Sequence, residues 1–290
     1  MIVVPGPASQ RLGKSIAVEL GVEPYPLEWR IFPDGESYIR YPRPIGGESV
    51  VLIQSCPPPT DRNLMQLFLM AEGARKMGAN NVSAVIPYLA YMRQDKAFRV
   101  GDVVSVDAVA RLVQAVGIEE VVTVDVHSQE SLAPFKIPIK NVSAMPALAE
   151  YLRMLPMKRP LILAPDKGAK HHAELVAETL GATDCIVLNK HRDRVTGQVD
   201  IDEKTIDLAG REVVVVDDIV STGGTIVKAV EMASKLMAKS IYVACTHALL
   251  MGDAKERIKQ SGVTSIIGTD TVENETSIVS VAPAIASILR

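Results

Sequence analysis

Short runs of apolar and β-branched residues alternate with longer helical patterns along the whole chain. The run Val213–Val216 is apolar without alternation, which is typical of strands buried on both faces. We expect strands at Ile2–Val4, Ser49–Gln54, Val82–Pro87, Glu120–Val126, Pro160–Ala164, Cys185–Leu188, Arg211–Val216, Ser240–Thr246 and Thr264–Thr269. We expect helices at Ser9–Leu20, Asp61–Met77, Ser105–Val116, Met145–Leu155, Gly168–Leu180, Thr222–Leu236 and Asp253–Gln260. This alternation predicts an α/β fold with mostly parallel sheets flanked by helices.

A proline-bearing connector, Lys136–Asn141, interrupts the alternation near the middle of the chain. It divides the 290 residues into two nearly equal parts, each long enough to bury a core of its own. We therefore expect an N-terminal domain at 1–140 and a C-terminal domain at 141–290. The similar patterning of the two halves permits two related domains, although no repeat of individual residues links them.

Composition narrows the class of protein. Apolar residues make up 48% and charged residues 22%, as in ordinary globular proteins, and the net charge of −3 argues against a nucleic-acid partner held by bulk electrostatics. The three cysteines are isolated, which fits a reducing compartment. No apolar run approaches the roughly 20 residues that span a bilayer, and the N-terminus lacks the basic region of a signal peptide. We expect a soluble, cytoplasmic protein without a membrane partner.

Polar segments lie where ligands usually bind in open α/β sheets, beyond the carboxyl ends of strands. These segments are 32–36, 93–96, 125–129, 166–170 and 217–225.

The segment from Asp217 to Thr225 has the most distinctive chemistry. Gly223 and Gly224 let backbone N–H groups point at one spot, and the following helix adds its partial positive charge. The hydroxyl donors of the segment are Ser221, Thr222 and Thr225. Asp217 and Asp218 are suited to accept hydrogen bonds from vicinal hydroxyls. The segment predicts a sugar-phosphate site, with an ordinary capped helix after a tight turn as the alternative.

The segment from Asp217 to Thr225 closely resembles the phosphoribosyl-diphosphate-binding loop of the phosphoribosyltransferase fold. That superfamily contains transferases, a few regulators and the synthetase that makes the diphosphate. The resemblance implies two similar domains, each with a mostly parallel sheet flanked by helices.

Other segments resemble the ribose-phosphate pyrophosphokinases within that superfamily. Phe32-Pro33-Asp34-Gly35-Glu36 is similar to their nucleotide-contacting segment, which implies that the phenylalanine stacks on adenine and the acids meet its polar edge. Residues 87–96 resemble their Pro-Tyr-x-x-Tyr-x-Arg-Gln-Asp-Lys stretch, which implies ATP contacts by Arg93 and Gln94. Taken alone, the first segment reads equally as a β-turn with an exposed aromatic, and the second as a solvated charge cluster.

The resemblance also implies a metal site. The family's histidine contact to ATP-bound Mg²⁺ corresponds to His127, and its second metal contact corresponds to Asp166. Lys167 and Ala169 depart from the common Asp-Ala-Gly-Gly form, which puts the local backbone geometry in doubt. A histidine at a strand end also fits a structural role, because hard Mg²⁺ prefers oxygen ligands.

Lys190-His191-Arg192 resembles the family's Lys-x-Arg pair on a loop over the active site. In an extended segment the two cations point the same way, so Lys190 and Arg192 are expected to stabilise phosphate charge as it develops. Arg192 is also expected to contact ribose 5-phosphate. A solvent-facing basic loop is the alternative.

Together these matches imply an enzyme that transfers the pyrophosphoryl group of ATP to the anomeric hydroxyl of ribose 5-phosphate, giving phosphoribosyl pyrophosphate and AMP. They imply Mg²⁺ as the cofactor, and a homo-oligomer, a dimer or larger, in which the 32–36 segment reaches a neighbouring subunit's site. A phosphoribosyltransferase and a non-catalytic regulator that binds phosphoribosyl pyrophosphate are the alternatives.

Residues 8–15 nearly match the Walker A pattern of nucleotide-binding loops. The pattern requires glycine at the position of Ala8, and Gly6 lies two residues too early. Ser9 instead resembles a helix N-cap, which would place Gly13 in mid-helix. We therefore predict that this segment is not a phosphate-binding loop.

Overall fold

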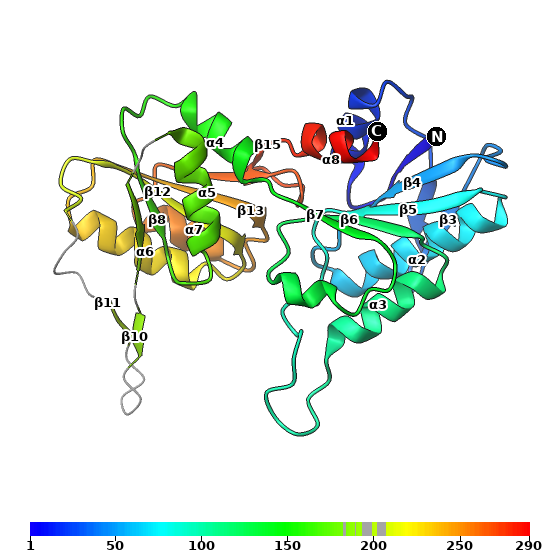
Figure 1. The fold of residues 1–290 in the computed structure, drawn as a ribbon, viewed down its shortest axis with the longest axis horizontal. Helices are drawn as coiled ribbons and strands as arrows, with labels where there is room; N and C mark the ends of the chain where they lie inside the picture. The colour runs from blue at the N-terminus through cyan, green and yellow to red at the C-terminus, as the bar shows by residue number, and fades with distance from the viewer. Residues whose placement is uncertain (182–183, 189, 193–198, 202–206) are drawn as a thin grey trace. The chain divides into compact units, whose positions relative to one another are not determined.

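The structure is a computed structural model that describes all residues except 182–183, 189, 193–198 and 202–206, and only the backbone of 190–192 and 199–201. The chain forms two compact units (Figure 1). The first contains 1–143, 270–273 and 280–290, and the second contains 144–269 and 274–279.

The first unit is built on a five-stranded parallel sheet in the order β1-β4-β5-β6-β7. Its strands are β1 (Ile2–Pro5), β4 (Ser49–Ile53), β5 (Asn81–Ile86), β6 (Glu120–Val124) and β7 (Ile139–Val142). Its helices are α1 (Gln10–Glu19), α2 (Thr60–Lys76), α3 (Ser105–Ala115), the 3-10 helix η1 (Gln129–Leu132) and α8 (Ala282–Leu289). Figure 1 shows α2 and α3 on one face of this sheet and α1 and α8 on the other.

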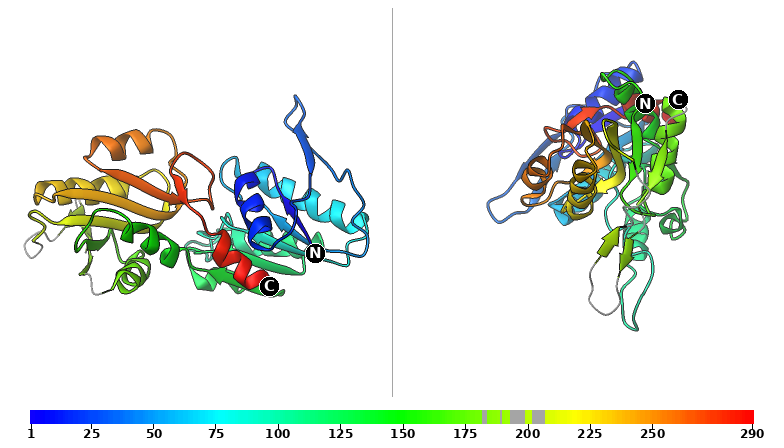
Figure 2. Two further views of the ribbon diagram at one scale, coloured as in Figure 1. Left: turned by 90° about the horizontal axis from the view of Figure 1, so that it is seen from above. Right: turned by 90° about the vertical axis from the view of Figure 1, so that its left-hand side faces the viewer.

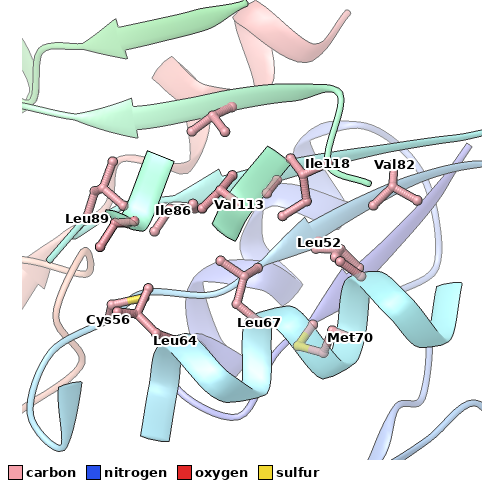
Figure 3. Packing of buried hydrophobic residues seen from close by; sticks show 14 of the residues in the cluster. Leu52, Cys56, Leu64, Leu67, Met70, Val82, Ile86, Leu89, Val113 and Ile118 are labelled. Atoms are coloured by element: carbon pink, nitrogen blue, oxygen red, sulfur yellow. The ribbon is translucent and has the colours of Figure 1, made fainter. Parts of the chain in front are cut away.

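Both faces of the first sheet are buried. Leu52 of β4 packs with Leu67 and Met70 of α2 in the cluster shown in Figure 3. Val51 and Ile53 are equally buried on the opposite face, because successive strand residues point to opposite sides. This double burial explains the uninterrupted apolar run in the sequence.

An antiparallel hairpin, β2 (Glu28–Ile31) and β3 (Ser37–Arg40), extends the first unit and was not expected from the sequence. Every residue of β2 is exposed, so the strand lacks the buried alternation by which strands are recognised.

The second unit is built on a six-stranded parallel sheet in the order β15-β14-β13-β12-β8-β9, with helices on both faces (Figure 2). Its strands are β8 (Leu161–Ala164), β9 (Cys185–Val187), β12 (Glu212–Val220), β13 (Ser240–Ala248), β14 (Ser265–Thr269) and β15 (Ser277–Val279). Its helices are α4 (Met145–Arg153), α5 (Lys170–Leu180), α6 (Gly224–Lys235) and α7 (Ala254–Gln260). A separate antiparallel pair consists of β10 (Lys190–Arg192) and β11 (Val199–Ile201).

The consecutive valines of β12 divide between two cores. Val213 and Val215 pack in the cluster that includes α6, whereas Val214 and Val216 pack in the cluster that includes α4 and α5. The expected α/β class, with mostly parallel sheets flanked by helices, is therefore confirmed. Within the described residues, no helix combines the length and apolarity that crossing a membrane requires.

Two details of the division into units differ from the sequence analysis. Residues 139–142, expected as a connector, form β7, which pairs with β6 and completes the first sheet. The C-terminal residues 280–290, expected in the second half, belong to the first compact unit, where α8 packs against α1. The functional division into domains 1–140 and 141–290 stays a prediction.

Candidate active site

The second sheet contains a topological switch point between β8 and β12. From β8 the chain continues to β9 on one side, and from β12 it continues to β13 on the other. Open α/β sheets bind ligands at such reversals, outside the carboxyl ends of the strands. Asp166 follows β8, and Asp217 and Asp218 lie near the carboxyl end of β12. The structure thus brings together the carboxylates predicted for metal and for ribose.

The turn after β8 holds the Asp166 carboxylate in place. Its Oδ1 atom accepts hydrogen bonds from the N–H groups of Gly168 at 3.0 Å and Ala169 at 3.4 Å. A Cβ atom on Gly168 would lie 3.2 Å from this oxygen, so glycine suits the turn. Lys167 is exposed and Ala169 is buried in the core beneath. The departures from the family pattern at 167 and 169 therefore leave the turn around the carboxylate intact.

Carboxyl groups are crowded together at the end of β12. Burial raises the pKa of Asp217 to about 9, and the carboxylates of Asp218 and Asp166 add to the rise. Backbone N–H groups orient both acids of β12: that of Asp218 donates to Asp217 Oδ1 at 3.0 Å, and that of Ile219 donates to Asp218 Oδ1 at 2.8 Å. The neighbouring carboxylates repel one another, and a divalent cation or the hydroxyl groups of a sugar bound between them would relieve this repulsion.

The loop between β12 and α6 has the geometry of an anion cradle. Gly223 has φ +74°, and α6 begins at Gly224. Among the hydrogen bonds of the described residues, none is donated by the backbone N–H groups of Thr222, Gly223 or Gly224. Thr222 and Gly224 are exposed at the helix N-terminus, where N–H groups and the helix dipole favour an anion.

Neighbouring elements hold this loop from behind. The N–H of Met251 donates to the carbonyl of Ser221 at 3.0 Å, and the Arg257 guanidinium of α7 donates to the carbonyl of Thr222 at 2.6 Å. Gly223 approaches α7 so closely that a Cβ atom there would lie 3.0 Å from Ile258 Cδ1. Sequence reasoning missed Arg257, because it lies on a helix far along the chain from the loop that it holds.

The predicted catalytic pair lies on β10. The backbones of Lys190 and Arg192 pair with Ile201 and Val199 of β11, and positions two apart in a strand share one face. Their side chains lie outside the described part of the structure, so their roles stay predictions.

The predicted nucleotide segment, 32–36, forms the tip of the β2–β3 hairpin. The N–H of Phe32 donates to the carbonyl of Glu36 at 2.8 Å, and that of Glu36 donates to Asp34 Oδ1 at 3.1 Å. Gly35 closes the turn with φ +95°, and the N–H of Gly35 donates to the carbonyl of Phe32 at 2.9 Å. The acidic side chains are exposed beside the aromatic ring.

Arg30 fixes the ring at this tip. Its guanidinium carbon lies 4.8 Å from the ring centroid of Phe32 and 4.8 Å from that of Tyr38. Such cation–π contacts orient a half-buried ring and place a cation next to it. Sequence reasoning missed Arg30, although its position two residues before Phe32 places both side chains on one face of an extended segment.

Arg93 and Gln94 follow β5 and are exposed. The hydroxyl of Ser105, the first residue of α3, donates to Gln94 Oε1, and the N–H of Gln94 donates to the carbonyl of Tyr91 at 3.2 Å. The structure therefore places both predicted ATP contacts on one ordered turn of the first unit.

His127 is exposed just beyond β6. The turn before it contains the buried Asp125, whose φ is +37° and whose N–H donates to the carbonyl of Val142 at 2.9 Å. His127 lies in the first unit and Asp166 in the second. Among the described residues, no group of three or more histidine, cysteine or acidic side chains is arranged to hold a metal by itself.

The near-match to a Walker A loop is a helix, as predicted, with Ser9 at its N-cap position, but the Ser9 side chain makes no capping hydrogen bond. Residues 13–15 lie inside α1, and the start of this helix is already occupied by a carboxylate. Glu273 Oε1 accepts hydrogen bonds from the N–H groups of Arg11 at 2.8 Å and Leu12 at 2.9 Å. An acidic side chain of the protein therefore stands where a phosphate would have to bind.

Known families match both parts of the chain. The model for the N-terminal domain of ribose phosphate pyrophosphokinase matches residues 1–117, and the model for the phosphoribosyl transferase domain matches residues 138–282.

Full-length relatives agree with these matches. A ribose-phosphate pyrophosphokinase from Saccharolobus solfataricus is 41% identical over 283 residues, covering 97% of each chain. One from Methanothermobacter thermautotrophicus is 43% identical over 284 residues, covering 98% of each. The crystal structure of phosphoribosylpyrophosphate synthetase from Mycobacterium smegmatis has a TM-score of 0.88 at 27% identity, covering 100% of this chain and 97% of that one. The chain belongs to the ribose-phosphate pyrophosphokinase family.

Proposed function

We propose that this protein transfers the pyrophosphoryl group of ATP to the anomeric hydroxyl of ribose 5-phosphate, producing phosphoribosyl pyrophosphate and AMP. The observation that supports the proposal most is the switch-point site of the second unit, where an exposed anion cradle adjoins carboxylates. Full-length similarity to pyrophosphokinases supports the choice of reaction. In this reaction the hydroxyl attacks the β-phosphorus of ATP and AMP leaves.

Ribose 5-phosphate is assigned to the second unit. The 5-phosphate would accept hydrogen bonds from the cradle, whose residues are Ser221, Thr222, Gly223, Gly224 and Thr225. Asp217 and Asp218 would accept hydrogen bonds from the ribose hydroxyls. This assignment is supported by the exposed N–H groups at the start of α6 and by the buried acids just before them.

ATP is assigned to segments of the first unit. Phe32 would stack on adenine while Asp34, Gly35 and Glu36 meet its polar edge, and Arg93 and Gln94 would contact the nucleotide from the turn after β5. The assignment is supported by accessibility: Phe32 is half-buried and the other residues are exposed, so a ligand can reach them without rearranging the core.

Mg²⁺ is the proposed cofactor, with Asp166 and His127 as its protein contacts. The acidic end of β12 fits a hard cation, since carboxylate oxygens are the ligands that Mg²⁺ prefers. When bound, the metal would neutralise phosphate charge during transfer. Lys190 and Arg192 would supply further positive charge, and Arg192 would also contact ribose 5-phosphate.

We also propose that the protein acts in the cytoplasm as a homo-oligomer whose sites share residues between subunits. The exposed hairpin supports this proposal, because Trp29 and Ile31 are each 42% accessible on a strand that, among the described residues, pairs only with β3.

Two alternatives use the same cradle. A phosphoribosyltransferase would pair it with a nitrogenous base, and a regulator would bind phosphoribosyl pyrophosphate without reaction. The match of residues 1–117 to a pyrophosphokinase N-terminal domain favours the synthetase over both.

The deciding experiment is incubation of the protein with ATP, ribose 5-phosphate and Mg²⁺, with the nucleotides separated by chromatography. We expect AMP and phosphoribosyl pyrophosphate in equal amounts, and no product in excess EDTA. ADP as the product would indicate an ordinary kinase. If the protein binds phosphoribosyl pyrophosphate but does not turn over ATP, it is a regulator. If it consumes phosphoribosyl pyrophosphate only when a nitrogenous base is present, it is a transferase.

A further inference from the structure

A buried hydrogen-bonded junction lies at the carboxyl end of β4, centred on Ser55, which has no exposed surface. The Ser55 hydroxyl donates to the carbonyl of Thr271 at 2.5 Å and accepts from the N–H of Tyr88 at 3.0 Å. The Ser55 N–H donates to the Ser9 hydroxyl at 2.8 Å. Through its hydroxyl and its backbone N–H, Ser55 therefore contacts three segments, at Thr271, Tyr88 and Ser9, that are far apart in the sequence.

Tyr88 is the residue at which the predicted ATP-contacting segment, 88–96, leaves β5. Both of its backbone polar groups are held at the junction, because its carbonyl also accepts from the N–H of Cys56 at 2.9 Å. Arg93 and Gln94 lie five and six residues further along. The direction in which this segment starts is thus set by Ser55 and Cys56.

Thr271 belongs to a strap, which we define as residues 270–273. The strap leaves β14 of the second sheet, packs within the first unit and leads back to β15. The Glu273 carboxylate anchors it to the N-terminus of α1, and Asp270 Oδ1 accepts from the N–H of Val281 at 2.9 Å. Ser55 therefore links an anchored strap to the start of the 88–96 segment.

We propose that Ser55 is a positioning residue for ATP, an inference that rests on the proposed function. The Ser55 hydroxyl donates to the Thr271 carbonyl and accepts from the Tyr88 N–H at the same time, and an alanine side chain can do neither. Alanine would remove the hydroxyl from both contacts, one of them fully buried, so the base of the segment would relax. Arg93 and Gln94 would then lose the fixed geometry on which nucleotide binding depends.

The test compares Ser55→Ala with Tyr41→Phe. Tyr41 is a buried residue of the same unit whose hydroxyl donates to the Met70 carbonyl at 2.7 Å, away from the 88–96 segment. Each variant removes a buried hydroxyl, so both are expected to lower the melting temperature. Only Ser55→Ala should raise the KM for ATP, by about 5- to 30-fold, while the KM for ribose 5-phosphate stays within about twofold.

Two further measurements keep the outcomes distinct. Ser55→Thr retains the hydroxyl and should restore the KM for ATP toward that of the wild type. Amide hydrogen exchange at Tyr88 should speed up in Ser55→Ala and not in Tyr41→Phe, and ATP binding by equilibrium dialysis should weaken in parallel, without any need for turnover.

If Ser55→Ala raises the KM for ATP and the KM for ribose 5-phosphate equally, or raises neither, Ser55 has only a structural role and the positioning proposal is wrong. The proposed function would still stand. If the wild type binds ATP but forms no AMP, the proposed function fails, and dialysis still decides whether Ser55 controls nucleotide binding. A wild-type protein that does not bind ATP would overturn both.

Discussion

Asp217 is a residue whose folded environment opposes its charge. Burial and the carboxylates of Asp218 and Asp166 raise its pKa to about 9, so near neutral pH the folded protein retains a proton that the unfolded chain has released. Between the ordinary aspartate pKa, about 4, and about 9, the folded state binds more protons, and its stability falls as pH rises. Asp217, which is proposed to bind ribose, therefore destabilises the folded protein when no ligand is bound.

We predict that Asp217→Asn raises the melting temperature of the unliganded protein while abolishing synthesis. The gain should be small at pH 5 and grow toward pH 9, because the amide does not ionise. Thermal unfolding at several pH values measures this, with Glu231→Gln, an exposed carboxylate of α6, as the control. A gain that does not depend on pH would show that the carboxylate is not held protonated.

Gly223 and Gly224 are adjacent in the cradle but face different constraints. Gly223 has φ +74° and lies against Ile258, whereas a Cβ atom on Gly224 would have no heavy atom within 4 Å. We predict that Gly223→Ala lowers the free energy of unfolding by roughly 1–3 kcal/mol, the usual range for a left-handed backbone without glycine. It should also weaken ribose 5-phosphate binding while ATP binding persists.

Gly224→Ala is the matched control for this prediction. It should leave the free energy of unfolding nearly unchanged, since alanine is a good helix former and the space is open. Denaturant unfolding and calorimetric titration with each substrate measure both variants. Equal destabilisation by the two substitutions would contradict the role given to the left-handed conformation.

At the scale of elements, the central strands of both sheets and the edge strands β1 and β9 were predictable, whereas the β2–β3 hairpin and the edge strand β15 were not. β4 and β12 are apolar runs because both faces are covered, and this signal is visible in sequence. β2 is exposed throughout, and β15 is a three-residue edge strand. Both strands are short, and β2 lacks the buried alternation from which a strand is recognised in sequence.

The end of β12 shows a second limit of sequence reasoning. The acidic pair Asp217–Asp218 was expected in the loop after the strand, but β12 continues through it to Val220. Pairing with β13 on one side keeps the strand extended, as in the register of Asp217 with Cys245. Tertiary pairing therefore overrides the low strand preference of aspartate.

The cap on α1 gives a prediction at this scale. Glu273 accepts from two N–H groups in the first turn of the helix, and such a cap with its charge contributes about 1–2 kcal/mol. Glu273→Ala should lower the free energy of unfolding by that amount. Glu275→Ala, which removes only a mostly exposed partner of Lys255, should leave it nearly unchanged. Chemical denaturation of both variants decides whether the cap is as described.

At the scale of the whole molecule, the sequence predicted the site as a set of segments but not their anchoring. The rule of strand ends found the segments after β5, β6, β8 and β12, because it needs only the order of strands and polar residues. Ser55, also at the end of a strand, was missed because its role depends on contacts with Thr271 and Tyr88 that folding creates. The sequence also does not show which residues of one subunit serve another.

The shared-site proposal can be tested with two defective variants. Phe32 lies at the exposed tip of the β2–β3 hairpin and Lys190 on β10, in different units of the chain. If each site takes the hairpin from one subunit and Lys190 from its neighbour, Phe32→Ala/Asp34→Ala and Lys190→Ala should each be nearly inactive alone. In a mixed dimer, one site would contain every intact residue and the other would contain both defects.

The hybrid dimer should therefore regain up to about half of the wild-type activity. Random exchange makes about half of the dimers hybrids, which brings the bulk figure to roughly a quarter. The measurement is AMP formation before and after mixing, with subunit exchange followed by native mass spectrometry. Wild type mixed with Lys190→Ala controls for losses during exchange. Confirmed exchange without any recovered activity would mean that the Phe32 segment serves its own subunit, because no arrangement of intact residues across subunits would then complete a site.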